Sequence, residues 1–176
     1  MLEGKTVNLR IVEKEDLPLL TEWLNNPEFS GEFMWFPQQQ SRAEREKEYD
    51  NLPPDTKQFF IEKKDGTKIG WMGHFLLGSL LEIFYYLLPS ERGKGYGTEA
   101  AIIMVDYLFL SKDLERIQAK ADPENIASCK ALEKAGFKRE GILRKTFFCR
   151  GKWKDDCMFS ILREEWKEPK ILTRTT

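Results

Sequence analysis

The pattern of polar and apolar residues predicts one strand and two helices in the first third of the chain. Residues 6–11 alternate between polar and apolar, which is the period of a half-buried strand. Residues 15–25 carry apolar side chains at helical spacing. A charged helix is predicted after Ser41, because Glu44 follows three residues later and completes the sequence of a capping box.

The middle of the chain predicts three strands. Residues 58–63 and 68–77 flank Asp65-Gly66, a dipeptide typical of a hairpin turn. Residues 80–88 are almost continuously apolar, as in a strand that is buried on both faces.

The period then changes between helix and strand. The pattern predicts helices at 95–110 and 124–135, a strand at 116–121, and two long strands at 137–150 and 152–162. A loose tail is expected from about residue 168. This order of elements predicts a mixed α/β (α+β) sheet in a single domain that covers residues 1–176.

Composition narrows the classes of function. The chain has 176 residues, one histidine, three cysteines without a CxxC pair, and a net charge of −1. The charge balance argues against nucleic-acid binding as the main role. The cysteines and the single histidine give no pattern of a metal site, and no apolar run is long enough to span a membrane. Without a recognisable signal peptide, we expect a cytoplasmic protein with reduced thiols.

The most informative segment is the glycine-rich turn at residues 92–97, Arg-Gly-Lys-Gly-Tyr-Gly, between a buried strand and a helix. Such a junction directs free backbone amides and the positive end of the helix dipole to one place. Glycines let a phosphate approach the backbone, and Arg92 and Lys94 add positive charge. A tight turn whose glycines serve packing alone is the alternative. The spacing fits neither the dinucleotide fingerprint nor the Walker sequence.

The spacing Arg92-x-x-Gly95-x-Gly97 resembles the acyl-CoA signature of the GNAT acetyltransferase superfamily. A second block, from Asn125-x-x-Ser128 to Glu-Lys-Ala-Gly-Phe at 133–137, is similar to the RimJ/RimL-type branch, which acetylates the N-termini of ribosomal proteins. The resemblance covers about residues 2–166. It implies the GNAT fold, a twisted mixed sheet of about seven strands with helices on both faces.

The resemblance also implies acetyl-CoA as co-substrate, with its pyrophosphate on the amides of the glycine loop. The pantetheine arm would lie between the strand that ends at Leu88 and the strand 116–121. A backbone amide near Tyr86 to Leu88 would hold the thioester carbonyl, and Asn125 would bond the pantetheine or the amine. Lys130 and Lys134 are candidates for the CoA 3′-phosphate, or simply a solvated charged face. The implied cofactor-binding residues are Tyr86, Leu87, Leu88, Arg92, Gly93, Lys94, Gly95, Tyr96, Gly97, Thr98, Asn125 and Lys130.

The reaction needs a proton acceptor for the amine and a proton donor for the leaving thiolate. Glu82 is the first candidate for the base, although a strand-edge carboxylate in water explains it equally well. His74 is a candidate relay or acceptor ligand, with a structural histidine as the alternative. Many family members use a helix tyrosine as the acid, but its position here is Leu132. We therefore expect Ser128, one turn earlier, to donate the proton, unless the thiolate leaves unaided.

The acceptor side is less well defined by the sequence. Phe33 and Trp35 lie in the loop where this family often builds the acceptor wall, or they pack on the sheet. The acceptor amine can belong to a protein N-terminus, a polyamine or another small molecule. The leading hypothesis is direct acetyl transfer to a primary amine in a ternary complex, by a monomer or homodimer. The alternative is a non-catalytic acyl-CoA-binding regulatory module.

Overall fold

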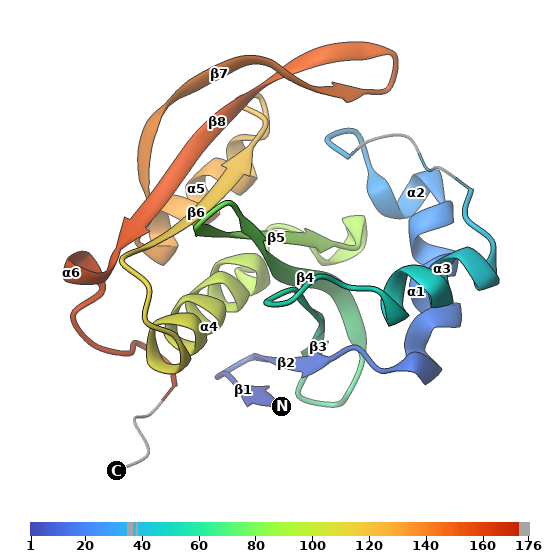
Figure 1. Ribbon diagram of the computed structural model, residues 1–176, viewed down its shortest axis with the longest axis horizontal. Coiled ribbons are helices and arrows are strands. Elements are labelled where there is room, and N and C mark those ends of the chain that lie inside the picture. The colour runs from blue at the N-terminus through green and yellow to red at the C-terminus, as the bar shows by residue number, and fades with distance from the viewer. Residues whose placement is uncertain (35–36, 38, 173–176) are drawn as a thin grey trace.

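The computed structural model of the protein describes residues 1–34, 37 and 39–172 (Figure 1). One sheet contains the eight strands of this part of the chain, in the order β1-β2-β3-β4-β5-β6-β8-β7. Neighbouring strands are antiparallel except β5 and β6, which are parallel. The strands are β1 (Leu2–Glu3), β2 (Val7–Ile11), β3 (Lys57–Lys63), β4 (Lys68–Leu77), β5 (Leu80–Leu87), β6 (Arg116–Ala121), β7 (Lys138–Cys149) and β8 (Lys152–Leu162).

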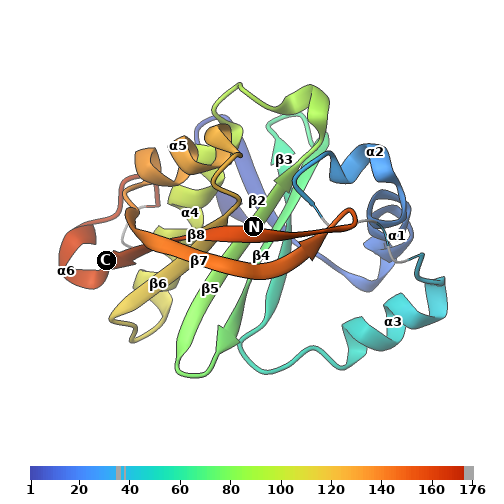
Figure 2. The ribbon, with the colours of Figure 1, turned by 90° about the horizontal axis from the view of Figure 1, so that it is seen from above.

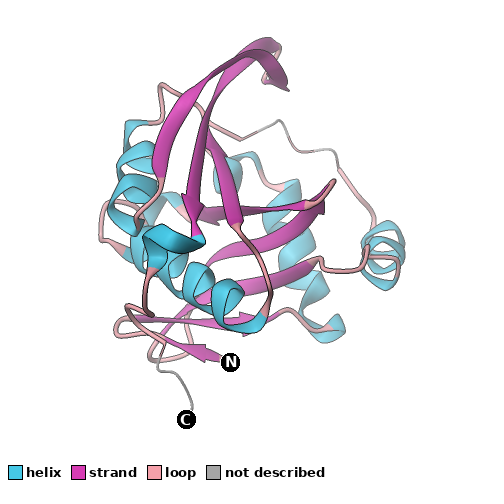
Figure 3. Cartoon of the chain, turned by 60° about the vertical axis from the view of Figure 1, so that its left-hand side comes forward, coloured by secondary structure: helices cyan, strands magenta, loops and turns pink. Residues whose placement is uncertain are grey.

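Helices cover both faces of the sheet (Figures 1 and 3). On one face, α4 and α5 share the larger core with the apolar side chains of the sheet. On the other face, α1 and α2 form a second core against Phe60 and Trp71. The helices are α1 (Leu17–Asn25), α2 (Pro27–Ser30), α3 (Arg42–Asp50), α4 (Tyr96–Ser111), α5 (Ile126–Ala135) and α6 (Arg163–Trp166), with 3-10 turns η1 (Lys14–Asp16) and η2 (Pro89–Glu91).

The predicted mixed sheet and its order of elements are confirmed, with one strand more than expected because β1 adds a short edge. The capping box at α3 is also present: the Ser41 side chain accepts a hydrogen bond from the Glu44 amide, and the Glu44 carboxylate accepts one from the Ser41 amide. The short elements α2 and α6 were not predicted, because four residues carry too little periodicity. The tail differs from the expected loose segment, since residues 170–172 are bonded to α4.

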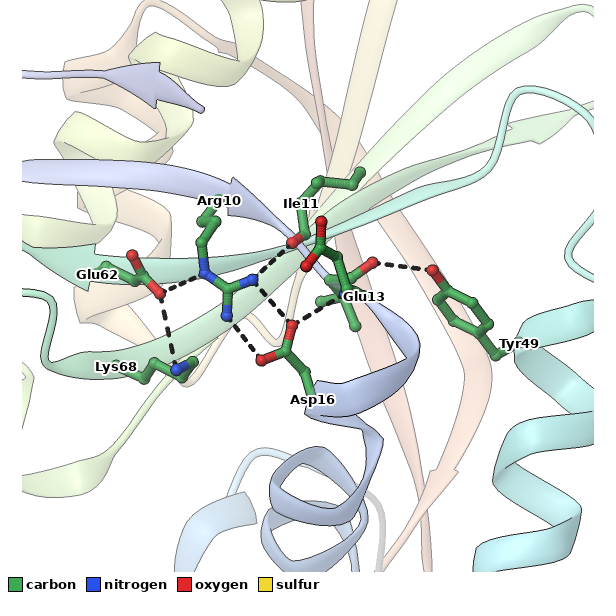
Figure 4. A network of polar contacts seen from close by, with 8 residues as sticks. Arg10, Ile11, Glu13, Asp16, Tyr49, Glu62 and Lys68 are labelled. Carbon is green, nitrogen blue, oxygen red and sulfur yellow. Dashed lines mark hydrogen bonds and ion pairs between the residues drawn. The ribbon is translucent and has the colours of Figure 1, made fainter.

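A charged network fastens the helical layer of α1 to the sheet (Figure 4). Arg10 on β2 donates to both carboxylate oxygens of Asp16, at 2.9 and 2.7 Å, and to Glu62 on β3 at 2.8 Å. Lys68 of β4 lies 3.9 Å from the same Glu62. Because Asp16 immediately precedes α1, the network fixes the direction in which that helix crosses the sheet.

Candidate active site

The parallel strands β5 and β6 separate halfway along their length (Figure 2). They pair only through Leu81 to Ile83, where Ile83 faces Ala119. Beyond that point β5 continues alongside β4 as far as Leu87, and β6 continues alongside β8 as far as Ala121. The far half of each strand therefore has one edge without a strand partner, and a slot opens between them.

The register shows which amides of β5 face this slot. The Leu88 amide donates to the Ile69 carbonyl of the β4 side at 2.9 Å. Because hydrogen-bonded pairs alternate along an antiparallel ladder, the amide of Tyr86 points the same way and that of Leu87 points toward the slot. Of the three residues proposed to hold the thioester carbonyl, the geometry therefore favours Leu87.

The glycine loop closes the end of the slot. Gly93 and Gly95 have φ angles of 75° and 87°, a left-handed conformation that glycine adopts without strain. A Cβ added at either position would meet nothing within 4 Å, so the loop's outer side is open. Gly95 is the N-cap of α4, whose first amides have no acceptor within the helix. The loop thus has the free donors and the space that an anionic ligand needs.

Gly97 serves a different purpose from the other two glycines. A Cβ on Gly97 would lie 3.1 Å from Cε2 of Tyr85, so its absence lets the tyrosine ring pack on the first turn of α4. The Tyr85 hydroxyl lies 3.1 Å from Ser128 Oγ on α5. Burial raises the pKa of Tyr85 to about 12, which keeps the phenol protonated. Tyr85 and Ser128 therefore form a neutral hydroxyl pair at the slot.

Sequence reasoning missed Tyr85. The family's helix tyrosine is Leu132 here, and the structure buries that leucine completely in the core. Asn125 uses its side-chain oxygen to cap α5, accepting from the Ser128 amide at 3.2 Å. The cap fixes Ser128 in the first turn, where it meets Tyr85. In the pair Tyr85-Tyr86, Tyr85 is the residue that points to the face of α4 and α5. Alternation of side chains along the strand predicts this direction once the face covered by α4 is known.

The two cations of the loop have separate roles. Arg92 Nε donates to the Leu87 carbonyl at 3.0 Å, and its guanidinium lies against Gly31, where a Cβ would be only 2.7 Å from Nη1. Arg92 therefore links the loop to the end of β5 and to the segment after α2. Lys94 stays at the rim, paired with Glu91 at 3.0 Å.

Glu82, the sequence candidate for the base, lies before the point where the strands separate. The residue is 7% exposed. Gln118 Nε2 donates to its Oε2 at 2.8 Å, and Lys120 Nζ lies 3.4 Å from the same oxygen. Two neighbours on β6 thus already hold the carboxylate.

Asp156 is a second carboxylate on the same face, and sequence reasoning missed it. It lies on β8, where its Oδ2 accepts from Thr146 Oγ1 at 2.9 Å. Burial raises the pKa of Asp156. Burial, followed by the charge of Asp156, also raises the pKa of Tyr86. The available signal was the pair Asp155-Asp156 inside the predicted strand 152–162.

His74 does not reach the slot, and the structure therefore corrects its predicted role at the acceptor site. The side chain is fully buried on the α4 face, with its ring 6.2 Å from that of Tyr107 and 6.4 Å from that of Phe59. Burial lowers its pKa to about 4, so the ring is neutral at pH 7.

The remaining acceptor and cofactor candidates lie at the rim. Phe33 is half-buried beside Met34, whose carbonyl accepts from Cys149 Sγ at 3.1 Å. Trp35 falls outside the residues that the structure describes. Lys130 is exposed on α5. In the described part of the chain, no three His, Cys, Asp or Glu side chains are grouped to hold a metal ion, and no helix there is long and apolar enough to cross a membrane.

Comparison with known proteins identifies the family. Residues 6–138 match the model of the acetyltransferase (GNAT) domain family. The chain belongs to this family. It is 34% identical to the probable N-acetyltransferase YjcK of Bacillus subtilis over 181 residues, covering 94% of this chain and 98% of YjcK. The predicted family, the GNAT fold and the class of acetyl-CoA-dependent N-acetyltransferases are confirmed.

Two solved structures share the fold of this GNAT protein. Spermidine N-acetyltransferase from Vibrio cholerae, in complex with CoA and spermine, has a TM-score of 0.81 at 24% identity, covering 93% of this chain and 99% of that one. RimL, a ribosomal L7/L12 α-N-protein acetyltransferase in complex with CoA, has a TM-score of 0.80 at 19% identity, covering 92% and 97%. These structures support the fold, while the RimJ/RimL-type branch stays a prediction.

Proposed function

We propose that this chain transfers the acetyl group of acetyl-CoA to a cationic primary amine by direct attack in a ternary complex. The observation that carries the proposal is the slot between β5 and β6, which ends at an open glycine loop and has the Leu87 amide on its edge. The three cysteines do not provide a nucleophile for an acyl-enzyme, because Cys129, Cys149 and Cys157 are buried and burial raises the pKa of each thiol.

The slot and the loop divide the recognition of acetyl-CoA between them. The pyrophosphate binds the free amides at the start of α4, from Tyr96 to Thr98, and the pantetheine lies in the slot. The thioester carbonyl accepts from the Leu87 amide, which is in place before reaction and stabilises the developing oxyanion. Lys94 contributes charge at the rim. Arg92 holds the loop in shape through the Leu87 carbonyl, so its role is positioning.

The amine approaches from the face of α1 and α2. There Trp71 packs its ring 4.7 Å from that of Phe84 and 5.7 Å from that of Tyr86. Aromatic faces attract alkylammonium groups, and Asp156 adds a negative charge on the same face of the sheet. These features favour an alkylammonium acceptor such as a polyamine, the substrate class named for the Vibrio cholerae enzyme. A protein N-terminus, the class named for RimL, is the second candidate.

Proton transfers accompany each change of bonding. Asp156 takes a proton from the ammonium group, which frees the nitrogen lone pair to form the new N–C bond. The C–S bond breaks, and the thiolate receives a proton from the hydroxyl pair of Tyr85 and Ser128. The new amide nitrogen releases its second proton to solvent, and the hydroxyl pair regains its proton from solvent. Asp156 replaces Glu82 as the preferred base, because Gln118 and Lys120 already hold Glu82.

Release of free CoA thiol tests the proposal directly. Acetyl-CoA is offered with polyamines, N-terminal peptides, amino sugars, aminoglycosides and amino acids, and both substrates are varied. We expect thiol release with one class and intersecting kinetic patterns, because both substrates must be bound before transfer. Binding of acetyl-CoA without release with any amine would instead support the non-catalytic binding module.

A further inference from the structure

A pocket of about 360 Å³ lies beside the glycine loop. Its walls come from four parts of the chain that are far apart in sequence. Gly95 and Thr98 belong to the start of α4, Lys5 to the connection between β1 and β2, Lys134 to the last turn of α5, and Lys170 to the C-terminal tail. The pocket therefore exists only when the two termini are folded against α4.

The charge of this pocket is positive. One carboxylate, Glu99, is on its wall, and it is already bonded to the β1–β2 connection through the amide and hydroxyl of Thr6. Within residues 1–34, 37 and 39–172, no carboxylate forms an ion pair with Lys5, Lys134 or Lys170. Three lysines thus line the pocket with one carboxylate that is already hydrogen-bonded, which leaves the lining with a net positive charge.

The tail that carries Lys170 is held in place by a buried aspartate. Asp106 on α4 is fully buried and accepts hydrogen bonds from the tail at 2.8 to 3.0 Å. Its donors are Trp166 Nε1 and the successive amides of Lys170, Ile171 and Leu172. The Lys170 ammonium also donates to the Ala135 carbonyl at 3.5 Å. This arrangement fixes the lysine at the mouth of the pocket.

We propose that this pocket binds the 3′-phosphate on the adenosine of acetyl-CoA, so that the C-terminal tail is part of the cofactor site. The inference rests on the proposed use of acetyl-CoA. Gly95 belongs both to the pocket and to the phosphate-binding loop, so one ligand can occupy the two together. A phosphate monoester carries nearly two negative charges and three acceptor oxygens, which match three ammonium donors. Ile102 and Ile171 add apolar surface for the adenine.

The two lysines that the sequence suggested for the 3′-phosphate differ in their position relative to the pocket. Both Lys130 and Lys134 are exposed on α5, but only Lys134 lines the pocket. Lys5 and Lys170 are not on that helix and belong to the termini, so no pattern in the sequence of α5 reveals them.

Calorimetry with acetyl-CoA and with 3′-dephospho-acetyl-CoA tests the proposal on the full chain. We expect the parent protein to bind acetyl-CoA about 10-fold more tightly, since three exposed ion pairs contribute together. Lys170→Ala, Lys134→Ala and Lys5→Ala should each weaken acetyl-CoA binding about 2- to 5-fold and leave the dephospho compound unaffected. Lys47→Ala, on α3 at a distance from the pocket, is the control and should change neither.

Equal affinity of the parent protein for the two compounds would overturn the proposal, and so would a loss caused by Lys130→Ala but not by Lys170→Ala. Asp106→Asn gives a second test, because it weakens the tail anchor without removing a lysine and should reduce the preference as Lys170→Ala does. If neither compound binds, the proposed function fails, which is a different result from the loss of preference alone.

Discussion

The hydroxyl of Tyr85 lies 3.1 Å from Ser128 Oγ and joins strand β5 to helix α5 across the slot. In the mechanism that we propose, this pair protonates the leaving thiolate. Its phenol comes from a strand, because the helix position at which many family members carry a tyrosine is Leu132 here.

Tyr85→Phe should reduce kcat about 10- to 100-fold, at the lower end of general acid catalysis, because a thiol with a pKa near 8.5 also leaves unaided. The phenylalanine ring keeps the packing on Gly97, so the affinity for acetyl-CoA should stay the same. Stopped-flow thiol release and calorimetry measure the two quantities separately.

Ser128→Ala and the double variant decide whether Tyr85 and Ser128 act as a unit. If they share one proton path, the double variant should be no slower than the slower single variant, since the losses of coupled residues do not add. A Tyr85→Phe protein with an unchanged kcat would remove the pair from the mechanism.

Gly95→Val should abolish acetyl-CoA binding, because the new side chain would fill the open space at the start of α4. The φ of 87° also strains the valine, so a matched control is needed. Gly78→Val provides it: Gly78 has a φ of 64°, nothing within 4 Å of its Cβ, and a position in the hairpin between β4 and β5.

Both glycine variants should lose similar stability in urea unfolding, and only Gly95→Val should lose binding in calorimetry. Unchanged affinity in the Gly95 variant would show that the pyrophosphate does not lie on this loop.

Asp156→Asn should lower kcat/KM about 100-fold or more at pH 7, because the bound ammonium loses its proton acceptor. The loss should shrink as the pH rises toward the amine pKa near 10.4, where more substrate arrives unprotonated. Burial raises the pKa of Asp156, so the acid limb of the parent's profile should lie above the ordinary aspartate range.

Glu82→Gln is the matched comparison for Asp156→Asn. It removes a buried carboxylate on the same face that Gln118 and Lys120 already hold, and its pH profile should keep the parent's shape. If Glu82→Gln shows the pH-dependent loss and Asp156→Asn does not, the base is Glu82.

The fold was largely predictable because each long element has a clear period. Strand 80–88 and helix 95–110 are bounded by a glycine-rich turn, and both appear close to the expected residues. The glycine loop was predictable for the same reason, since its residues are contiguous. Short elements such as α2 were missed because four residues do not define a period.

The residues of the candidate site that were missed depend on side-chain direction and on contacts between distant segments. Tyr85 and Tyr86 are adjacent in sequence, yet one faces Ser128 on α5 and the other stacks on Trp71 on the opposite face. Histidine is a residue type common in catalytic sites, but the pairing of β4 with β5 directs the His74 side chain toward α4. Such directions follow from the register of the sheet, which the sequence of one strand does not determine.

His74 should make the fold sensitive to acid. Its folded pKa is about 4, below the ordinary value of 6.5, because burial disfavours the charged ring. Between these values the unfolded chain binds a proton that the folded protein excludes, so stability falls as the pH drops from 6.5 to 4, by up to about 3 kcal/mol. Urea unfolding of the parent and of His74→Gln across this range measures the effect. The variant should lose less stability than the parent between pH 6.5 and 4, whereas parallel curves would show that the histidine does not contribute.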